Sequence, residues 1–141
     1  MPYVIGAILA LSAGVFATLT GLDRDRAFYA TVTIVVALFY ALFAVMGGSS
    51  EALALELLAI AAFIAAAVAG FRHSMWLVAA ALVLHGVFDA VHGRMIENPG
   101  VPHWWPPFCL GYDVVAGLYL AVLLKTGRRK SRVNSNWMPG G

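Results

Sequence analysis

The sequence predicts an all-α polytopic membrane protein, built as a compact bundle of five transmembrane helices. Of its 141 residues, 62% are hydrophobic and only 11% are charged, and the mean hydropathy is +0.85, which excludes an ordinary soluble domain. Five apolar stretches are each long enough to cross a hydrocarbon layer about 30 Å thick, which takes roughly 20 helical residues. Because the connections are short, we expect residues 1–126 to form one bundle and residues 127–141 to form a basic cytoplasmic tail.

The first two predicted spans are Tyr3 to Thr20 and Ala27 to Met46. In the first span, Gly6, Ala10 and Gly14 recur every four residues, so they present a strip of small side chains on which another helix can lie closely. This span lacks the positively charged start and the clear small-residue cleavage pattern of a secretory signal. We therefore expect it to be a helix of the mature protein.

The other three predicted spans are Ser50 to Gly70, Met75 to His92 and Pro106 to Leu124. The third span is rich in alanine, which again favours close helix packing. The connection from Gly93 to Pro107 contains four prolines, so it is expected to be a stiff external loop or a lid over the residues beneath it.

The basic residues predict the orientation of the bundle. With five spans, eight of the nine Lys and Arg residues lie on one side and only Arg94 lies on the other. By the positive-inside rule, the N-terminus is then external and the C-terminus cytoplasmic, in a bacterial inner membrane. A count of four or six spans would mix the charges, so this separation supports five. The eight residues on the predicted cytoplasmic side are Arg24, Arg26, Arg72, Lys125, Arg128, Arg129, Lys130 and Arg132.

The fourth span carries three ionisable residues on one helical face. His85, Asp89 and His92 are spaced by four and then three residues, which places them within about 60° of one another. An aspartate at mid-helix costs roughly 2.5 to 3.5 kcal/mol on insertion scales, so it is expected to face the bundle interior. Glu56 and Asp113 fall at a similar depth on the third and fifth spans. We therefore expect all these groups to converge in the external half of the membrane.

Two imidazoles and up to three carboxylates suit a divalent zinc, iron or manganese ion. His85 and His92 are about 10 Å apart along the helix axis, so they would not share one ion without strain. A mononuclear site would need Glu56 or Asp113, whereas a dinuclear site would share Asp89. The predicted metal ligands are His85, Asp89, His92, Glu56 and Asp113, and the predicted catalytic groups are Asp89, Asp113 and Glu56, of which one that does not bind metal would transfer protons.

Two alternatives to a transition metal stay open. The carboxylates can orient the histidines by hydrogen bonds and hold the helices together without any ion. A buried histidine can also be an axial ligand of haem, although no Cys-x-x-Cys-His motif for covalent attachment is present. The single cysteine, Cys109, excludes an intramolecular disulfide and a site built from several thiolates.

Aromatic residues near the predicted cluster offer a ligand-binding wall. Trp104 and Trp105 lie at the external mouth of the last span, where they suit either a membrane-interface belt or a rigid wall for a ligand. Tyr40 and Tyr112 lie near the polar layer and can supply hydroxyl groups. We name Trp104, Trp105 and Tyr112 as the predicted cofactor-binding or ligand-binding residues.

The function predicted from these patterns is binding of a metal ion or small ligand in a pocket that faces the periplasm. Metal-assisted hydrolysis or redox chemistry on a lipid-like substrate is the enzymatic version of this hypothesis. The alternatives are a small transporter or proton relay, and a non-catalytic accessory subunit in which the cluster only holds the helices. The expected partners are membrane lipids, a lipid-like small molecule and a second copy in a homo-oligomer, with no nucleic acid.

Two short segments resemble known membrane proteins. The Trp-Trp-Pro-Pro segment, Trp104 to Pro107, resembles the tryptophan-rich sensory protein family, which binds porphyrins and sterols. The resemblance covers these four residues alone, and the acidic and histidine stripe is not part of that family's pattern, so no site is carried over. The His-Gly-x-x-Asp-x-x-His helix is similar to small uncharacterised bacterial multi-pass proteins, a resemblance that implies no function.

Overall fold

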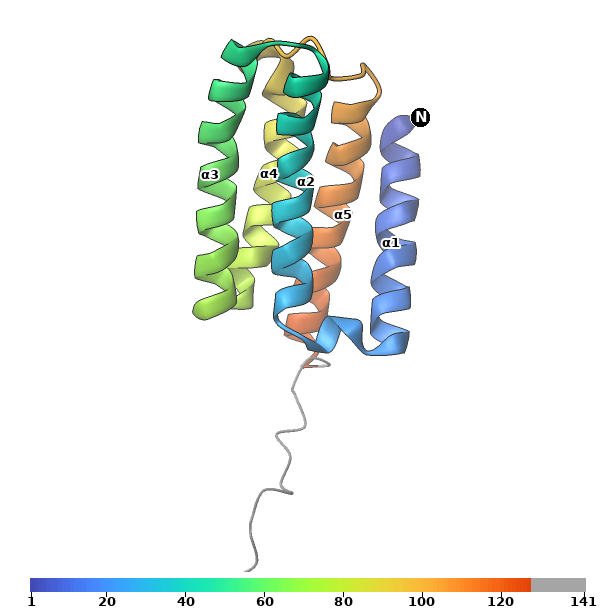
Figure 1. Cartoon of the computed structure of the whole chain (residues 1–141). Helices are drawn as coiled ribbons and strands as arrows, with labels where there is room; N and C mark the ends of the chain where they lie inside the picture. The colour runs from blue at the N-terminus through green and yellow to red at the C-terminus, as the bar shows by residue number, and fades with distance from the viewer. Residues whose placement is uncertain (128–141) are drawn as a thin grey trace, which may run out of the picture.

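The computed structural model describes residues 1–127, which fold into an all-α bundle (Figure 1). Five helices in this range are long and apolar enough to cross a membrane, which confirms the predicted all-α class and the five spans. The basic tail after residue 127 lies outside the described residues. The helices are α1 (Pro2–Thr20), α2 (Ala27–Met46), α3 (Ser50–Arg72), α4 (Met75–Met95) and α5 (Trp105–Lys125), with a 3-10 turn at Leu22–Arg24.

The helix ends follow local signals in the sequence. Gly21 adopts a left-handed conformation, with φ of 83°, directly after α1, as glycine commonly does at a helix C-terminus. Ser49 caps α3 by accepting a hydrogen bond from the Ala52 backbone N–H at 3.1 Å. The fourth helix begins at Met75 as predicted and continues beyond His92 to Met95.

Consecutive helices alternate in direction, and α4 and α5 pack against each other in the bundle (Figure 1). On one side of this pair, α3 contacts α4 and α2 contacts α3. On the other side, α1 packs extensively on α5, and within the described part of the chain it makes no comparable contact with α2, α3 or α4. The bundle is therefore tight around α4, whereas α1 and α2 lie apart.

The small-residue strip of α1 is the surface that meets α5. Gly6, Ala10 and Gly14 are all buried. A Cβ atom added at Gly6 would lie 2.1 Å from the backbone oxygen of Phe108, and one added at Gly111 would lie 2.0 Å from that of Tyr3. The two backbones thus touch where each helix lacks a side chain, as small-xxx-small packing requires.

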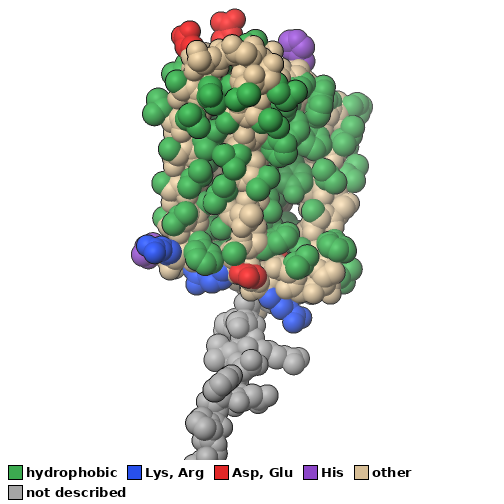
Figure 2. Space-filling view, viewed as in Figure 1, with side chains coloured by type: hydrophobic (Ala, Val, Ile, Leu, Met, Phe, Trp, Pro, Cys, Tyr) green, Lys and Arg blue, Asp and Glu red, His purple; other side chains and the backbone are tan. Residues whose placement is uncertain are grey.

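The charge separation in the sequence is also present in the fold. On the face shown in Figure 2, the Lys and Arg side chains gather at the end of the bundle that carries the α1–α2 connection. Arg72 and Lys125 end their helices at this same end, whereas Arg94 lies near the end of α4 at the opposite one. This distribution is the basis for the predicted orientation in the membrane, which stays a prediction.

Replacing Gly6 with alanine should destabilise the packing of α1 on α5. The added Cβ would collide with backbone that cannot move freely, so we expect a loss of about 1–3 kcal/mol, typical of overpacking, in the free energy of unfolding in detergent micelles. Gly93→Ala is the matched control, because a Cβ at Gly93 meets nothing within 4 Å. Equal stability of the two variants would contradict this account of the α1–α5 contact.

Candidate functional site

The structure brings the five predicted ionisable residues together inside the bundle. His85, Asp89 and His92 lie on the buried face of α4, while Glu56 comes from α3 and Asp113 from α5. All five are at most 2% exposed. They occupy the half of the bundle that carries the α2–α3 and α4–α5 connections, opposite most of the described basic residues. The expected convergence is therefore present, in two adjoining groups.

The first group, which we call the triad, consists of His85, Asp89 and Asp113. The His85 Nδ1 atom lies 2.6 Å from Asp113 Oδ2 and 3.5 Å from Asp89 Oδ2. Two carboxylates thus face the same imidazole nitrogen. On the other side of Asp89, the Tyr40 hydroxyl donates a hydrogen bond to Oδ1 at 2.5 Å.

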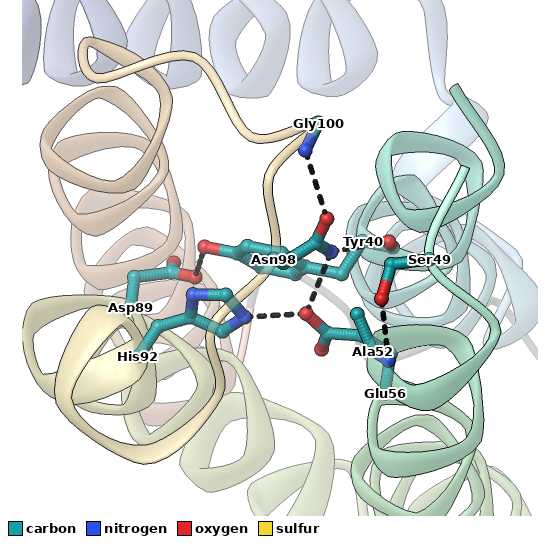
Figure 3. Close-up of polar contacts among 8 residues, drawn as sticks. All are labelled: Tyr40, Ser49, Ala52, Glu56, Asp89, His92, Asn98 and Gly100. Atoms are coloured by element: carbon teal, nitrogen blue, oxygen red, sulfur yellow. Dashed lines mark hydrogen bonds and ion pairs between the residues drawn. The ribbon is translucent and has the colours of Figure 1, made fainter. Parts of the chain in front are cut away.

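The second group, the Glu56–His92 pair, lies beside the α4–α5 loop (Figure 3). The His92 Nε2 atom is 2.6 Å from Glu56 Oε1. Asn98 of the loop donates from its side-chain amide to the same Glu56 oxygen at 2.9 Å. The Asn98 side-chain oxygen accepts from the Gly100 backbone N–H at 3.2 Å, so the loop fixes the amide that holds Glu56.

Tyr40 of α2 connects the triad with the Glu56–His92 pair. Its hydroxyl contacts Asp89, and its ring stacks on His92 with centroids 4.1 Å apart and planes inclined by 24°. Its backbone carbonyl accepts a second hydrogen bond from Asn98 at 3.1 Å. One residue thus contacts both groups and the loop (Figure 3), which makes it the structural centre of the site.

Aromatic rings pack against both histidines. The Phe63 ring meets His85 edge-on, with centroids 4.7 Å apart, and Phe88 meets His92 at 5.4 Å in the same manner. Such an apolar environment has a low local dielectric, which strengthens each satisfied polar contact and penalises each unsatisfied one. Each polar group of the site therefore needs a hydrogen-bonding or charged partner.

The acidic groups outnumber their partners. Glu56, Asp89 and Asp113 are buried, yet every Lys and Arg among residues 1–127 is exposed. In the described structure, one oxygen of each carboxylate, namely Glu56 Oε2, Asp89 Oδ2 and Asp113 Oδ1, is buried without a hydrogen-bond partner. An unsatisfied buried acceptor costs about 1–3 kcal/mol. The arrangement therefore favours an additional cation or proton at these oxygens.

The triad fits the requirements of a divalent metal ion. Its three ligand atoms, one from each residue, all lie within 4.8 Å of one another. One imidazole nitrogen and two carboxylate oxygens suit zinc, iron or manganese. Metal–ligand distances of about 2.0–2.2 Å require the 2.6 Å contact between His85 and Asp113 to open by several tenths of an ångström. Asp113 of α5 thus offers a third candidate ligand atom beside those of His85 and Asp89 on α4.

The predicted ligand-binding aromatic residues lie elsewhere. Trp105 and Tyr112 line an apolar cavity between α1, α2 and α5, while Trp104 is 53% exposed and contacts Trp105 edge-on. Trp104 therefore contacts Trp105 but is not among the residues that line the cavity. Cys109, a free and buried thiol, lines the same cavity.

The sequence analysis missed Asn98. It lies in an Asn-Pro-Gly turn, a composition typical of loops, and its role depends on the loop folding back over α2 and α3. The close approach of Gly100 to α2 shows this folding, since a Cβ on Gly100 would lie 1.7 Å from the Phe43 backbone oxygen. The signal in the sequence for this contact is the glycine, Gly100, two residues after the side-chain amide of Asn98.

Comparisons with known proteins do not place this chain in a family. No protein-family model, no curated protein and no solved structure matches it. The functional assignment below is therefore argued from the geometry of the site.

Replacing Asn98 with alanine should destabilise the protein through the site. The change removes the amide that donates to Glu56 and to the Tyr40 carbonyl. We expect a loss of about 2–4 kcal/mol in the free energy of unfolding, because two hydrogen bonds are lost and their acceptors are left without this donor. Glu97→Ala is the control, since Glu97 is exposed on the same loop. If the two variants unfold at the same denaturant concentration, Asn98 does not hold the site together.

Proposed function

We propose that this membrane protein binds one divalent transition-metal ion at the triad of His85, Asp89 and Asp113. The observation that carries the proposal is that two buried carboxylates face a single imidazole nitrogen, at 2.6 and 3.5 Å. Each of these carboxylates also has one oxygen without a donor among the described residues. A metal ion would compensate the excess negative charge and coordinate the oxygens together.

Three protein ligands leave at least one coordination position for water or a substrate, as in catalytic rather than structural metal sites. A bound zinc, iron or manganese ion would supply Lewis-acid or redox chemistry there. Tyr40 would orient Asp89 through its hydroxyl, as partners of metal ligands commonly do. The Glu56–His92 pair, joined to the triad through Tyr40, is then the candidate group for proton transfer.

The second candidate function is a proton relay without a metal. It is favoured by the 2.6 Å contact between His85 and Asp113, because two ligands of one ion lie about 3 Å or more apart at ordinary metal–ligand distances. In this version, protons supply the positive charge that the carboxylates need. Asp113, His85, Asp89 and Tyr40 would then form a chain of neighbouring proton-binding groups.

Elemental analysis of the purified full-length protein should detect about one transition-metal ion per chain, because a single triad offers one ligand set. Asp113→Asn should reduce the metal affinity by more than the roughly 10–100-fold that substitutions outside the ligand shell cost. Affinity should also fall as the pH is lowered, since protons compete for the same ligand atoms. The matched control is Asp23→Asn, which changes another buried carboxylate, 4% exposed, at the other end of the bundle.

Two outcomes would overturn the metal assignment. The first is equal metal content in Asp113→Asn and Asp23→Asn, and the second is no binding by protein dialysed against each of the three metals. Proton flux into vesicles reconstituted with metal-free protein, abolished by Asp113→Asn and retained by Asp23→Asn, would establish the relay instead.

A further inference from the structure

An apolar groove opens between α1 and α2, with α5 as its floor. Figure 2 shows the hollow between these two helices, and the cavity has a volume of about 410 Å³, within the usual range of ligand pockets. On α2 it extends from Phe39 to Thr31, about 12 Å at 1.5 Å per residue. Its lining residues are Leu9 of α1, five residues of α2 and four of α5, including Trp105, Cys109 and Tyr112.

The lining restricts what the groove can hold. Aliphatic and aromatic side chains, such as Leu9, Val36 and Phe39, form most of its surface. A sugar, a nucleotide or an extended peptide would lose hydrogen bonds to water there without replacement, at a cost of several kcal/mol for each polar group. The groove lies along transmembrane helices and opens sideways between them. A hydrocarbon chain from the bilayer needs no hydrogen bonds, and it can enter through this sideways opening.

The Trp105 side chain lines the groove at the start of α5. The Trp105 indole N–H is buried and has no hydrogen-bond partner within residues 1–127. Tryptophan at a helix end lies at the membrane interface, where its ring contacts hydrocarbon and its N–H meets polar headgroups. An oxygen acceptor at this depth would satisfy the donor. An acyl chain with an ester carbonyl at one end matches the groove and the indole together.

The groove also adjoins the polar site. Val36 lines the groove and lies one helical turn from Tyr40, while Cys109 lies one turn from Asp113. Residues four apart share a face of a helix, and all four of these residues are buried. The wall of the groove is therefore continuous with the residues that surround the triad.

We propose that this groove binds one acyl chain of a membrane phospholipid, with an ester carbonyl oxygen accepting a hydrogen bond from Trp105. The binding site stands on the groove and the unpartnered indole, independently of any metal. We further propose that phospholipids are the substrate class of the triad, and only this second step rests on the proposed function.

The test uses the full-length protein in nanodiscs of phosphatidylethanolamine and phosphatidylglycerol, doped with phosphatidylglycerol that carries a diazirine on its acyl chain. After illumination, mass spectrometry should find the label concentrated on the groove residues of α1, α2 and α5. Val35→Trp should reduce this labelling by roughly an order of magnitude, because the indole fills the cavity. Leu38→Trp is the matched control: both positions are on α2 and similarly exposed, at 45% and 44%, but only Val35 lines the groove.

Trp105→Phe keeps an aromatic ring but removes the N–H, so it should weaken labelling by about fivefold, the value of one hydrogen bond. Trp76→Phe, at an exposed tryptophan near the start of α4, should change nothing. Unlabelled phosphatidylglycerol should compete with the probe, and palmitate should not. Competition by palmitate alone, or labelling spread evenly over lipid-facing residues and insensitive to Val35→Trp, would overturn the proposal.

Metal analysis of the same samples separates this proposal from the metal assignment. Groove labelling in a protein that binds no metal would leave the phospholipid site standing and remove its link to the triad. A stoichiometric metal ion without groove labelling would support the metal assignment and overturn the phospholipid site.

Discussion

The site depends on one constraint: Glu56, Asp89 and Asp113 are buried together in an apolar bundle, while no Lys or Arg among residues 1–127 is buried. The insertion cost of such groups is high, so each must be satisfied by a specific neighbour. His85 and His92 supply these neighbours from the α4 face, and Tyr40 and Asn98 supply two further donors. Because one oxygen of each carboxylate has no hydrogen-bond partner among residues 1–127, the arrangement favours an additional cation or proton.

The two sides of the bundle are held together by different physical means. Glycine contacts, such as that of Gly6 with the Phe108 backbone, bring α1 and α5 close, and the Thr18 and Tyr119 hydroxyls, 2.8 Å apart, add a hydrogen bond between the two helices. On the other side, the loop crosses between helices, and Asn98 connects α2 with α3 through hydrogen bonds. The apolar groove forms between these two sides, where α1 and α2 make no extensive contact within residues 1–127. The positions of the polar site and of the groove thus both follow from the way the bundle divides into these two sides.

The sequence predicts the features that depend on periodicity and on membrane solvation. Span length gives the five helices, and the spacing of His85, Asp89 and His92 gives their common face. The cost of exposing charge to lipid leads to the expected convergence with Glu56 and Asp113. The pairing of these groups could not be predicted, because it depends on helix rotation and on tertiary packing. For the same reason, the Asn98 contacts and the position of Tyr112 on the groove emerge only from the fold.

X-ray absorption spectroscopy of the zinc-loaded protein would test the central claim most directly, because it reports the ligands of the ion themselves. The geometry predicts nitrogen and oxygen ligands at about 2.0–2.2 Å, with the scattering pattern of a single imidazole, and loss of this spectrum in Asp113→Asn. A first shell with two or more imidazoles or with sulfur, or an ion with only water ligands, would contradict a metal centre at His85, Asp89 and Asp113.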